Sequence, residues 1–173
     1  MKTGSKTTVR LTLLAVFAAM TMALSALENA LPPLPVPGAR MGLSNIAVTA
    51  GMWLISPASG WLLGAVKVGF TLFTRGATAA IMAGAGTCLS VGITAVLLPL
   101  YARERLSFIG INIAAATAHT LGQLTAATWW LTPAVWAYAP LLLLTAAATG
   151  TVTGLVLNLT LERVSRAIRY TKE

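Results

Sequence analysis

The chain has 173 residues, of which 57% are hydrophobic and 9% charged, and its formal net charge is +8. Soluble domains have about 25% charged residues, so this composition excludes an ordinary soluble enzyme and indicates an integral membrane protein. Because a spanning helix needs about 20 apolar residues, 173 residues allow five or six spans and leave no room for a second, soluble domain. The positive charge does not indicate nucleic-acid binding, because the basic residues flank apolar runs and form no basic face on a soluble module.

The first apolar run covers residues 11–31 and follows a polar, basic segment. A signal peptide has the same order of segments, but this run is long enough to span a membrane and further runs follow it. Ala15, Ala19 and Ala23 recur every four residues and give the predicted helix a smooth face. Faces of this kind allow close approach of another helix, so we expect a partner protein to dock there.

Residues 32–42 form the clearest break in the chain, with four prolines, two glycines and one charged residue, Arg40. Prolines cannot continue a helix, so this segment is predicted to be a loop. It is either a plain connector or a lid that packs over the outer end of the helices.

Five more apolar runs follow this loop, and together with the first they predict an all-α, six-helix transmembrane bundle that forms a single domain. The predicted spans are residues 11–31, 43–56, 58–74, 77–101, 108–131 and 135–161, the last with a kink expected at Pro140. Two pairs of glycines, Gly60 with Gly64 and Gly150 with Gly154, have the spacing that lets membrane helices approach closely. We expect these pairs to serve internal packing, with docking of a partner as the alternative.

The distribution of basic residues predicts the topology. With the N-terminus inside the cell, the cytoplasmic segments hold nine of the 12 Lys and Arg residues. Positive residues concentrate on the cytoplasmic side of membrane proteins. We therefore expect a multi-pass protein of the cell membrane, with both termini cytoplasmic and the proline-rich loop outside.

A few charged residues lie inside or at the edges of the apolar runs, and they point to a polar site. A charge at membrane depth costs about 3 kcal/mol on insertion scales, so it usually faces a cavity or a partner. Lys67 and Arg75 are eight residues apart on one predicted helix and project to a similar side. They indicate either a basic site for an anionic group or ion pairs with Glu28 that hold helices together.

The fifth span contains three polar residues that line one helix face, Asn112, His119 and Gln123. Such a stripe faces inward, so we expect Lys67 and His119 to share an internal cavity. The side chains predicted to bind a ligand are Glu28, Arg40, Asn45, Lys67, Arg75, Asn112, His119 and Gln123. If Glu28 neutralises Lys67 the cavity suits an aromatic or amide-bearing molecule, and otherwise it suits a carboxylate or phosphate.

Catalytic and metal-binding patterns are missing from the sequence. The chain has a single cysteine, Cys88, and a single histidine, and it has no aspartate. Sites that hold Mg²⁺ and a diphosphate use clustered carboxylates, so we expect no catalytic residue, no metal site and no cofactor.

Three stretches together resemble a known family. They are residues 37–45 (PGARMGLSN), residues 67–76 with Lys67 and Arg75-Gly76, and residues 118–124 (AHTLGQL). They are similar to the loop, the basic third helix and the H-x-x-GQ helix of the Gx transporter family, which is also labelled heptaprenyl diphosphate synthase component I. Lys67 and Ser44 stand where Arg and Ala are common in that family, and both changes keep charge or size.

That family in turn resembles, in architecture, the substrate-binding S-components of energy-coupling-factor transporters. The resemblance implies a small-molecule ligand in a lipid-embedded bundle, a first outer loop that closes as a lid, and a transmembrane coupling protein with ATPases docked on the first helix. Three functions remain open. The first is a membrane component that binds or transports a small anionic or aromatic molecule. The second is a non-catalytic membrane subunit of a polyprenyl diphosphate synthase beside a soluble subunit, and the third is a structural partner of a redox or flavin-handling system.

Overall fold

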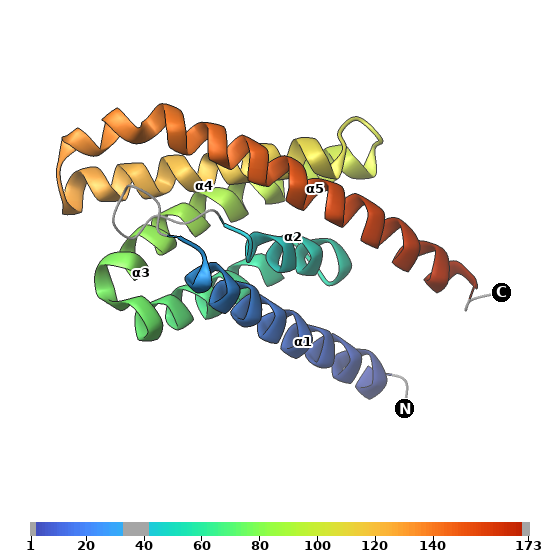
Figure 1. Cartoon of the computed structure of the whole chain (residues 1–173). Helices are drawn as coiled ribbons and strands as arrows, with labels where there is room; N and C mark the ends of the chain where they lie inside the picture. The colour runs from blue at the N-terminus through green and yellow to red at the C-terminus, as the bar shows by residue number, and fades with distance from the viewer. Residues whose placement is uncertain (1–2, 33–41, 171–173) are drawn as a thin grey trace.

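A computed structural model of the chain describes the backbone of residues 3–32 and 42–170 and the side chains of 7–32 and 42–161. The described part consists of five α-helices and one 3-10 helix (Figure 1). In chain order they are α1 (Thr3–Ala30), α2 (Asn45–Leu54), α3 (Ser59–Ala102), α4 (Phe108–Trp130), η1 (Pro133–Tyr138) and α5 (Ala139–Tyr170). The prediction of an all-α protein is therefore confirmed.

Three helical segments are long and apolar enough to cross a membrane by length and composition: Thr7–Ala30, Ser59–Ala102 and Pro133–Leu161. They indicate a multi-pass membrane protein. Helix α4 has 23 residues, which is long enough to span, but its polar residues Asn112, His119 and Gln123 make it less apolar than these three segments. Helix α2 has only 10 residues and is short for a span.

The residues expected to form the third and fourth spans follow each other in one 44-residue element, α3, which consists of two helical halves separated by the non-helical residue Gly76. At Gly76 the backbone leaves helical geometry, with φ 82° and ψ −179°. The chain bends back there, so that a β-carbon on Gly64 would lie 2.7 Å from the Thr87 methyl group. The two halves of α3 thus pack against each other (Figure 1).

The last predicted span also begins differently. Residues 133–138 form η1, and Pro140 is the second residue of α5. The missing N–H of proline is harmless in the first turn of a helix, so Pro140 starts α5 and does not kink it.

Glycines bring α3, α4 and α5 into close contact. A β-carbon on Gly154 would lie 2.5 Å from the Ile109 Cα, and one on Gly122 would lie 2.6 Å from the Ala85 carbonyl oxygen. A side chain at either position would therefore displace the backbone of the neighbouring helix. The structure thus uses Gly60, Gly64, Gly150 and Gly154 for internal packing.

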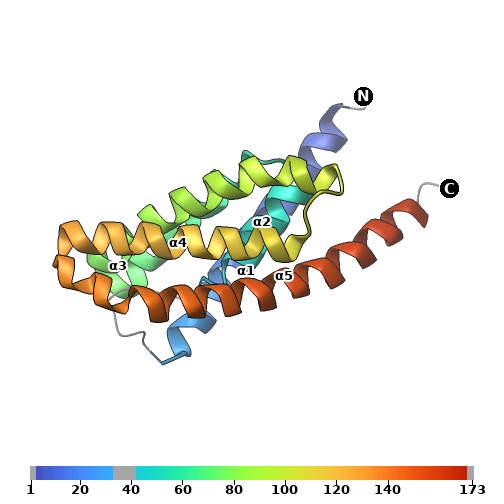
Figure 2. The ribbon, with the colours of Figure 1, turned by 90° about the horizontal axis from the view of Figure 1, so that it is seen from above.

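The apolar core is divided into two clusters, and a layer of buried polar side chains lies between them along α4. Phe108 and Ile111 belong to the first cluster, whereas Leu124 and Ala127 belong to the second. His119 lies between these pairs on the same helix and is 1% exposed. Two views show that α1 begins, and α5 ends, at the end of the molecule where the loop between α3 and α4 lies (Figures 1 and 2).

Candidate ligand-binding site

The polar layer gathers side chains from α1, α2, α3 and α4. Its members are almost inaccessible to solvent: Glu28 and Asn45 are each 8% exposed, Lys67 0%, His119 1% and Gln123 3%. A charged side chain buried this deeply in an apolar protein needs hydrogen-bonding partners. The following contacts are the hydrogen bonds and close approaches that these side chains make.

Glu28, in the last turn of α1, binds the segment that leads into α2. Its carboxylate accepts hydrogen bonds from the backbone N–H groups of Gly42 and Leu43, the latter at 2.9 Å, and from the Ser44 hydroxyl at 3.3 Å. A carboxylate at a helix N-terminus is favoured by unpaired N–H groups and by the helix dipole. Glu28 therefore ties the end of α1 to the beginning of α2.

Lys67, on the first half of α3, donates to the next residue of that segment. Its Nζ lies 2.7 Å from Oδ1 of Asn45. Residues 42–45 therefore lie between the acid of α1 and the base of α3, and hydrogen bonds link them to both.

His119, on α4, also lies next to this segment. Its Nε2 lies 3.1 Å from Nε2 of Gln123, one helical turn further on. A β-carbon on Gly86 would lie 2.7 Å from Nδ1 of His119, so the imidazole occupies space that a side chain on α3 would take. A β-carbon on Gly42 would lie 3.6 Å from Cδ2 of His119 and 2.9 Å from Nδ2 of Asn45. His119 and Asn45 therefore both border the position that a side chain on residue 42 would take.

Two of the predicted ligand-binding residues, Asn112 and Arg75, have a different place, and a third, Arg40, is outside the described residues. Asn112 is buried, but its amide donates to the Phe108 carbonyl oxygen of its own helix at 2.9 Å. Arg75 is half-buried and directly precedes the bend at Gly76, about two turns beyond Lys67. Arg40 lies outside the described residues, as does most of the predicted lid.

Sequence reasoning did not assign a role to three residues that shape this site. Ser44 donates to Glu28, Gly42 adopts φ 85° beside Asn45, and Gly86 gives His119 its space. The Gly42–Asn45 stretch stood in a family motif, which was the available signal for Gly42 and Ser44. For Gly86 the only signal was the run of glycines on α3.

The predicted docking face on α1 is exposed in the structure. Ala15, Ala19 and Ala23 are accessible, whereas Phe17 and Thr21 turn toward the other helices. The face is therefore available, and docking on it stays a prediction.

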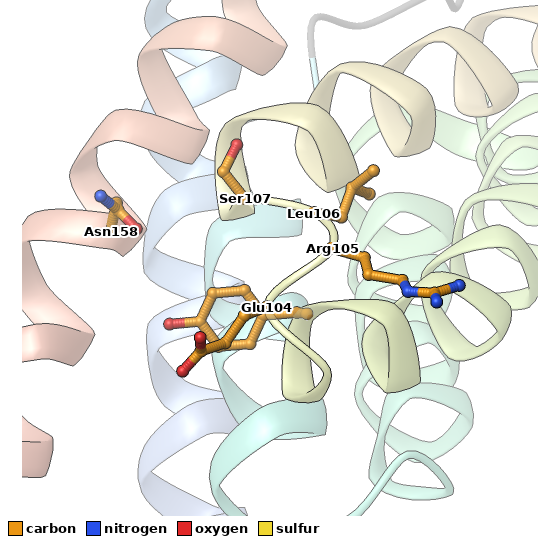
Figure 3. A pocket seen from close by; sticks show the side chains of 6 residues that line it. Glu104, Arg105, Leu106, Ser107 and Asn158 are labelled. Atoms are coloured by element: carbon orange, nitrogen blue, oxygen red, sulfur yellow. The ribbon is translucent and has the colours of Figure 1, made fainter.

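Two further depressions lie outside the polar layer. One, of about 420 Å³, is an apolar groove between the second half of α3 and α4, lined by Ile81, Ala85, Cys88, Leu89, Gly122, Thr125, Ala126, Trp129 and Trp130. The other, of about 360 Å³, lies at the loop between α3 and α4 and includes Glu104, Ser107 and Asn158. The Arg105 side chain points away from Asn158 there (Figure 3).

The long apolar helices and the buried polar layer indicate the class of the protein, which is a helical, multi-pass membrane protein with a polar interior. The family model of heptaprenyl diphosphate synthase component I matches residues 17–160, and the chain belongs to this family. The matched region contains Glu28, Asn45, Lys67, His119 and Gln123. Comparison with curated proteins found no match, and comparison with solved structures found none either.

Proposed function

We propose that this protein is a membrane component that binds a small anionic or aromatic molecule in the polar layer around Lys67, Asn45 and His119. The main supporting observation is that Lys67 is 0% exposed within an apolar protein and is hydrogen-bonded to Asn45. Charged residues at such depth are expensive and in membrane proteins commonly mark substrate or ion pathways. Transport of the bound molecule rests on this geometry and on the architectural resemblance to S-components.

A second candidate is a non-catalytic membrane subunit of a polyprenyl diphosphate synthase, and the description of the family favours it directly. The chain has no aspartate, so carboxylates for metal-held diphosphate would have to come from a soluble partner subunit. We expect the purified chain with Mg²⁺ to form no polyprenyl diphosphate. Formation of that product by the chain alone would overturn the non-catalytic assignment.

The depth of the site follows from the length of α2 if the protein crosses the membrane six times. In that arrangement the crossings are α1, α2, the two halves of α3, α4 and α5. With 10 residues, α2 rises about 15 Å, roughly half of the ~30 Å hydrocarbon core. If α2 ends near the cytoplasmic surface, residues 42–45 lie inside the bilayer.

The two candidates imply different partners. A transport component would place Ala15, Ala19 and Ala23 against a transmembrane coupling protein with ATPases. A synthase component would bind a soluble prenyl synthase subunit.

Native mass spectrometry of the purified protein tests the binding proposal. We expect a co-purified small molecule in the unmodified protein and its loss in Lys67→Met, because the substitution removes the ammonium from the polar layer. Arg75→Met is the matched control, since Arg75 is half-buried and outside the layer. Equal amounts of the bound molecule in both variants would argue against a site at Lys67.

Co-expression with a soluble DDxxD-type synthase from the same genome separates the two candidates. Purification of this protein together with the synthase, and a prenyl product that has a longer chain or forms at a higher rate, would support the synthase subunit. Joint purification with a coupling protein and ATPases would support transport.

A further inference from the structure

We infer that Asn45 recognises a negatively charged oxygen of the bound molecule, from a carboxylate or a phosphate, through its side-chain N–H₂ group. This inference rests on the proposed binding of a small molecule in the polar layer and narrows the class of that molecule from anionic or aromatic to oxyanionic.

The orientation of the Asn45 amide follows from its partner. Lys67 has only donors, so the atom 2.7 Å from its Nζ must be the amide oxygen, Oδ1. Nδ2 is therefore turned away from Lys67, and an exchanged assignment of the two atoms would place donor against donor.

The donor that remains, Nδ2, has no hydrogen-bond partner among the described residues, although Asn45 is only 8% exposed. Buried polar groups in native proteins are nearly always paired, so an unused N–H₂ group needs an explanation. Its place supplies one, because Nδ2 and the His119 ring both border the position of a β-carbon on residue 42, which glycine leaves without a side chain. A ligand atom that approaches Gly42 at this position would meet Nδ2.

The charges around Asn45 favour a negative ligand atom. Nδ2 and Nζ of Lys67 only donate, so the matching ligand atom is an acceptor. Glu28, the one carboxylate of the layer among the described side chains, already accepts from Gly42, Leu43 and Ser44 on the α1 side of the segment. The ammonium on Oδ1 also polarises the amide and strengthens its N–H donors, and bonds to an ionised acceptor are the strong ones.

The experiment compares unmodified protein with Asn45→Asp in detergent, using isothermal calorimetry. Aspartate keeps an acceptor for Lys67 but removes the donor, so the melting temperature without ligand should be retained. The probes are geranyl diphosphate with its neutral counterpart geraniol, and benzoate with benzamide. We expect one charged probe to bind at least tenfold more tightly than its neutral counterpart, and Asn45→Asp to weaken that binding at least tenfold. A preference within the geranyl pair would identify a phosphate as the source of the bound oxygen, and a preference within the benzoate pair would identify a carboxylate.

Neutral and charged probes that bind equally, or unchanged affinity in Asn45→Asp, would overturn the inference and leave the proposed function standing. If no probe binds and native mass spectrometry finds no co-purified molecule, the proposed function fails and the inference fails with it. If Asn45→Asp does not fold, the inference is tested by the preference of the unmodified protein for charged over neutral probes and by the affinity of Asn45→Ser for the same probes.

Discussion

Glu28 illustrates how a single buried carboxylate organises this site. Its two oxygens accept from Gly42, Leu43 and Ser44, so Glu28→Ala would leave buried donors without an acceptor. An unsatisfied buried donor costs about 1–3 kcal/mol, and we expect Glu28→Ala to lower the free energy of unfolding by about that amount. Denaturation in detergent, followed by tryptophan fluorescence, measures this.

Glu28→Gln is the matched variant, because the side chain keeps its size and one acceptor oxygen. It should lose less stability than Glu28→Ala. Glu104→Ala is an exposed control and should change little. If Glu28→Ala unfolds like the unmodified protein, the bonds to residues 42–44 do not stabilise the fold.

At this scale, the sequence identified polar residues well but not their partners. Lys67, His119 and Gln123 were recognisable because polar side chains in apolar runs must turn inward. The sequence left open whether Glu28 pairs with Lys67, because a carboxylate can accept from any donor that the fold brings near. Asn112 was placed with His119 by helical periodicity, which specifies a face but says nothing of which neighbour the side chain contacts.

At the scale of elements, the bend in α3 depends on one glycine. Gly76 adopts φ 82° and ψ −179°, a region that side chains with a β-carbon rarely enter. Backbone strain of this kind costs about 1–3 kcal/mol, so Gly76→Ala should lower the unfolding free energy by that amount. Since a β-carbon there would meet no atom within 4 Å, the effect would come from backbone conformation alone. A Gly76→Ala protein of unchanged stability would contradict this.

The contact between α4 and α5 depends on the absence of a side chain at Gly154. A β-carbon there would lie 2.5 Å from the Ile109 Cα, and backbone cannot move aside as a flexible side chain can. Overpacking of this kind costs about 1–3 kcal/mol, which is the loss that we expect for Gly154→Ala. Gly92→Ala on α3 is the control, because a β-carbon there meets nothing within 4 Å and alanine favours a helix by about 0.5–1 kcal/mol. Thermal unfolding of the two variants should therefore shift in opposite directions.

The helices themselves were largely predictable, because long apolar runs and prolines define where membrane helices start and stop. The predicted break between residues 74 and 77 coincides with the bend at Gly76. The two predicted spans therefore correspond to the two helical halves of α3. The sequence did not reveal that Pro133 would start a 3-10 helix, so that α5 begins at Ala139 and Pro140 lies in its first turn.

At the scale of the whole molecule, the tryptophans near the α4–η1 turn support one end as a membrane interface. Trp129 and Trp130 are 90% and 54% exposed, and Trp136 is 43% exposed. The indole N–H groups of Trp130 and Trp136 donate to Thr78 and Thr128. Tryptophans concentrate at membrane–water interfaces, so this end is expected to lie at the headgroup level. The opposite end of the molecule holds the start of α1 and the end of α5 (Figure 2).

The last prediction is the orientation of the whole protein. Nine of the 12 basic residues lie in the N-terminal segment, the loop between α3 and α4, and the C-terminal segment. Because positive residues favour the cytoplasmic side, both termini should be inside the cell and the α4–η1 turn outside.

Single cysteines at Gly4, Thr171 and Pro133 test this by labelling with a membrane-impermeant maleimide. The native Cys88 is exposed and must first be replaced by serine. We expect intact cells to be labelled at position 133 only, and all three positions to be labelled after permeabilisation. Labelling of position 4 or 171 in intact cells would reject this topology, and with it a six-crossing bundle that has both termini inside.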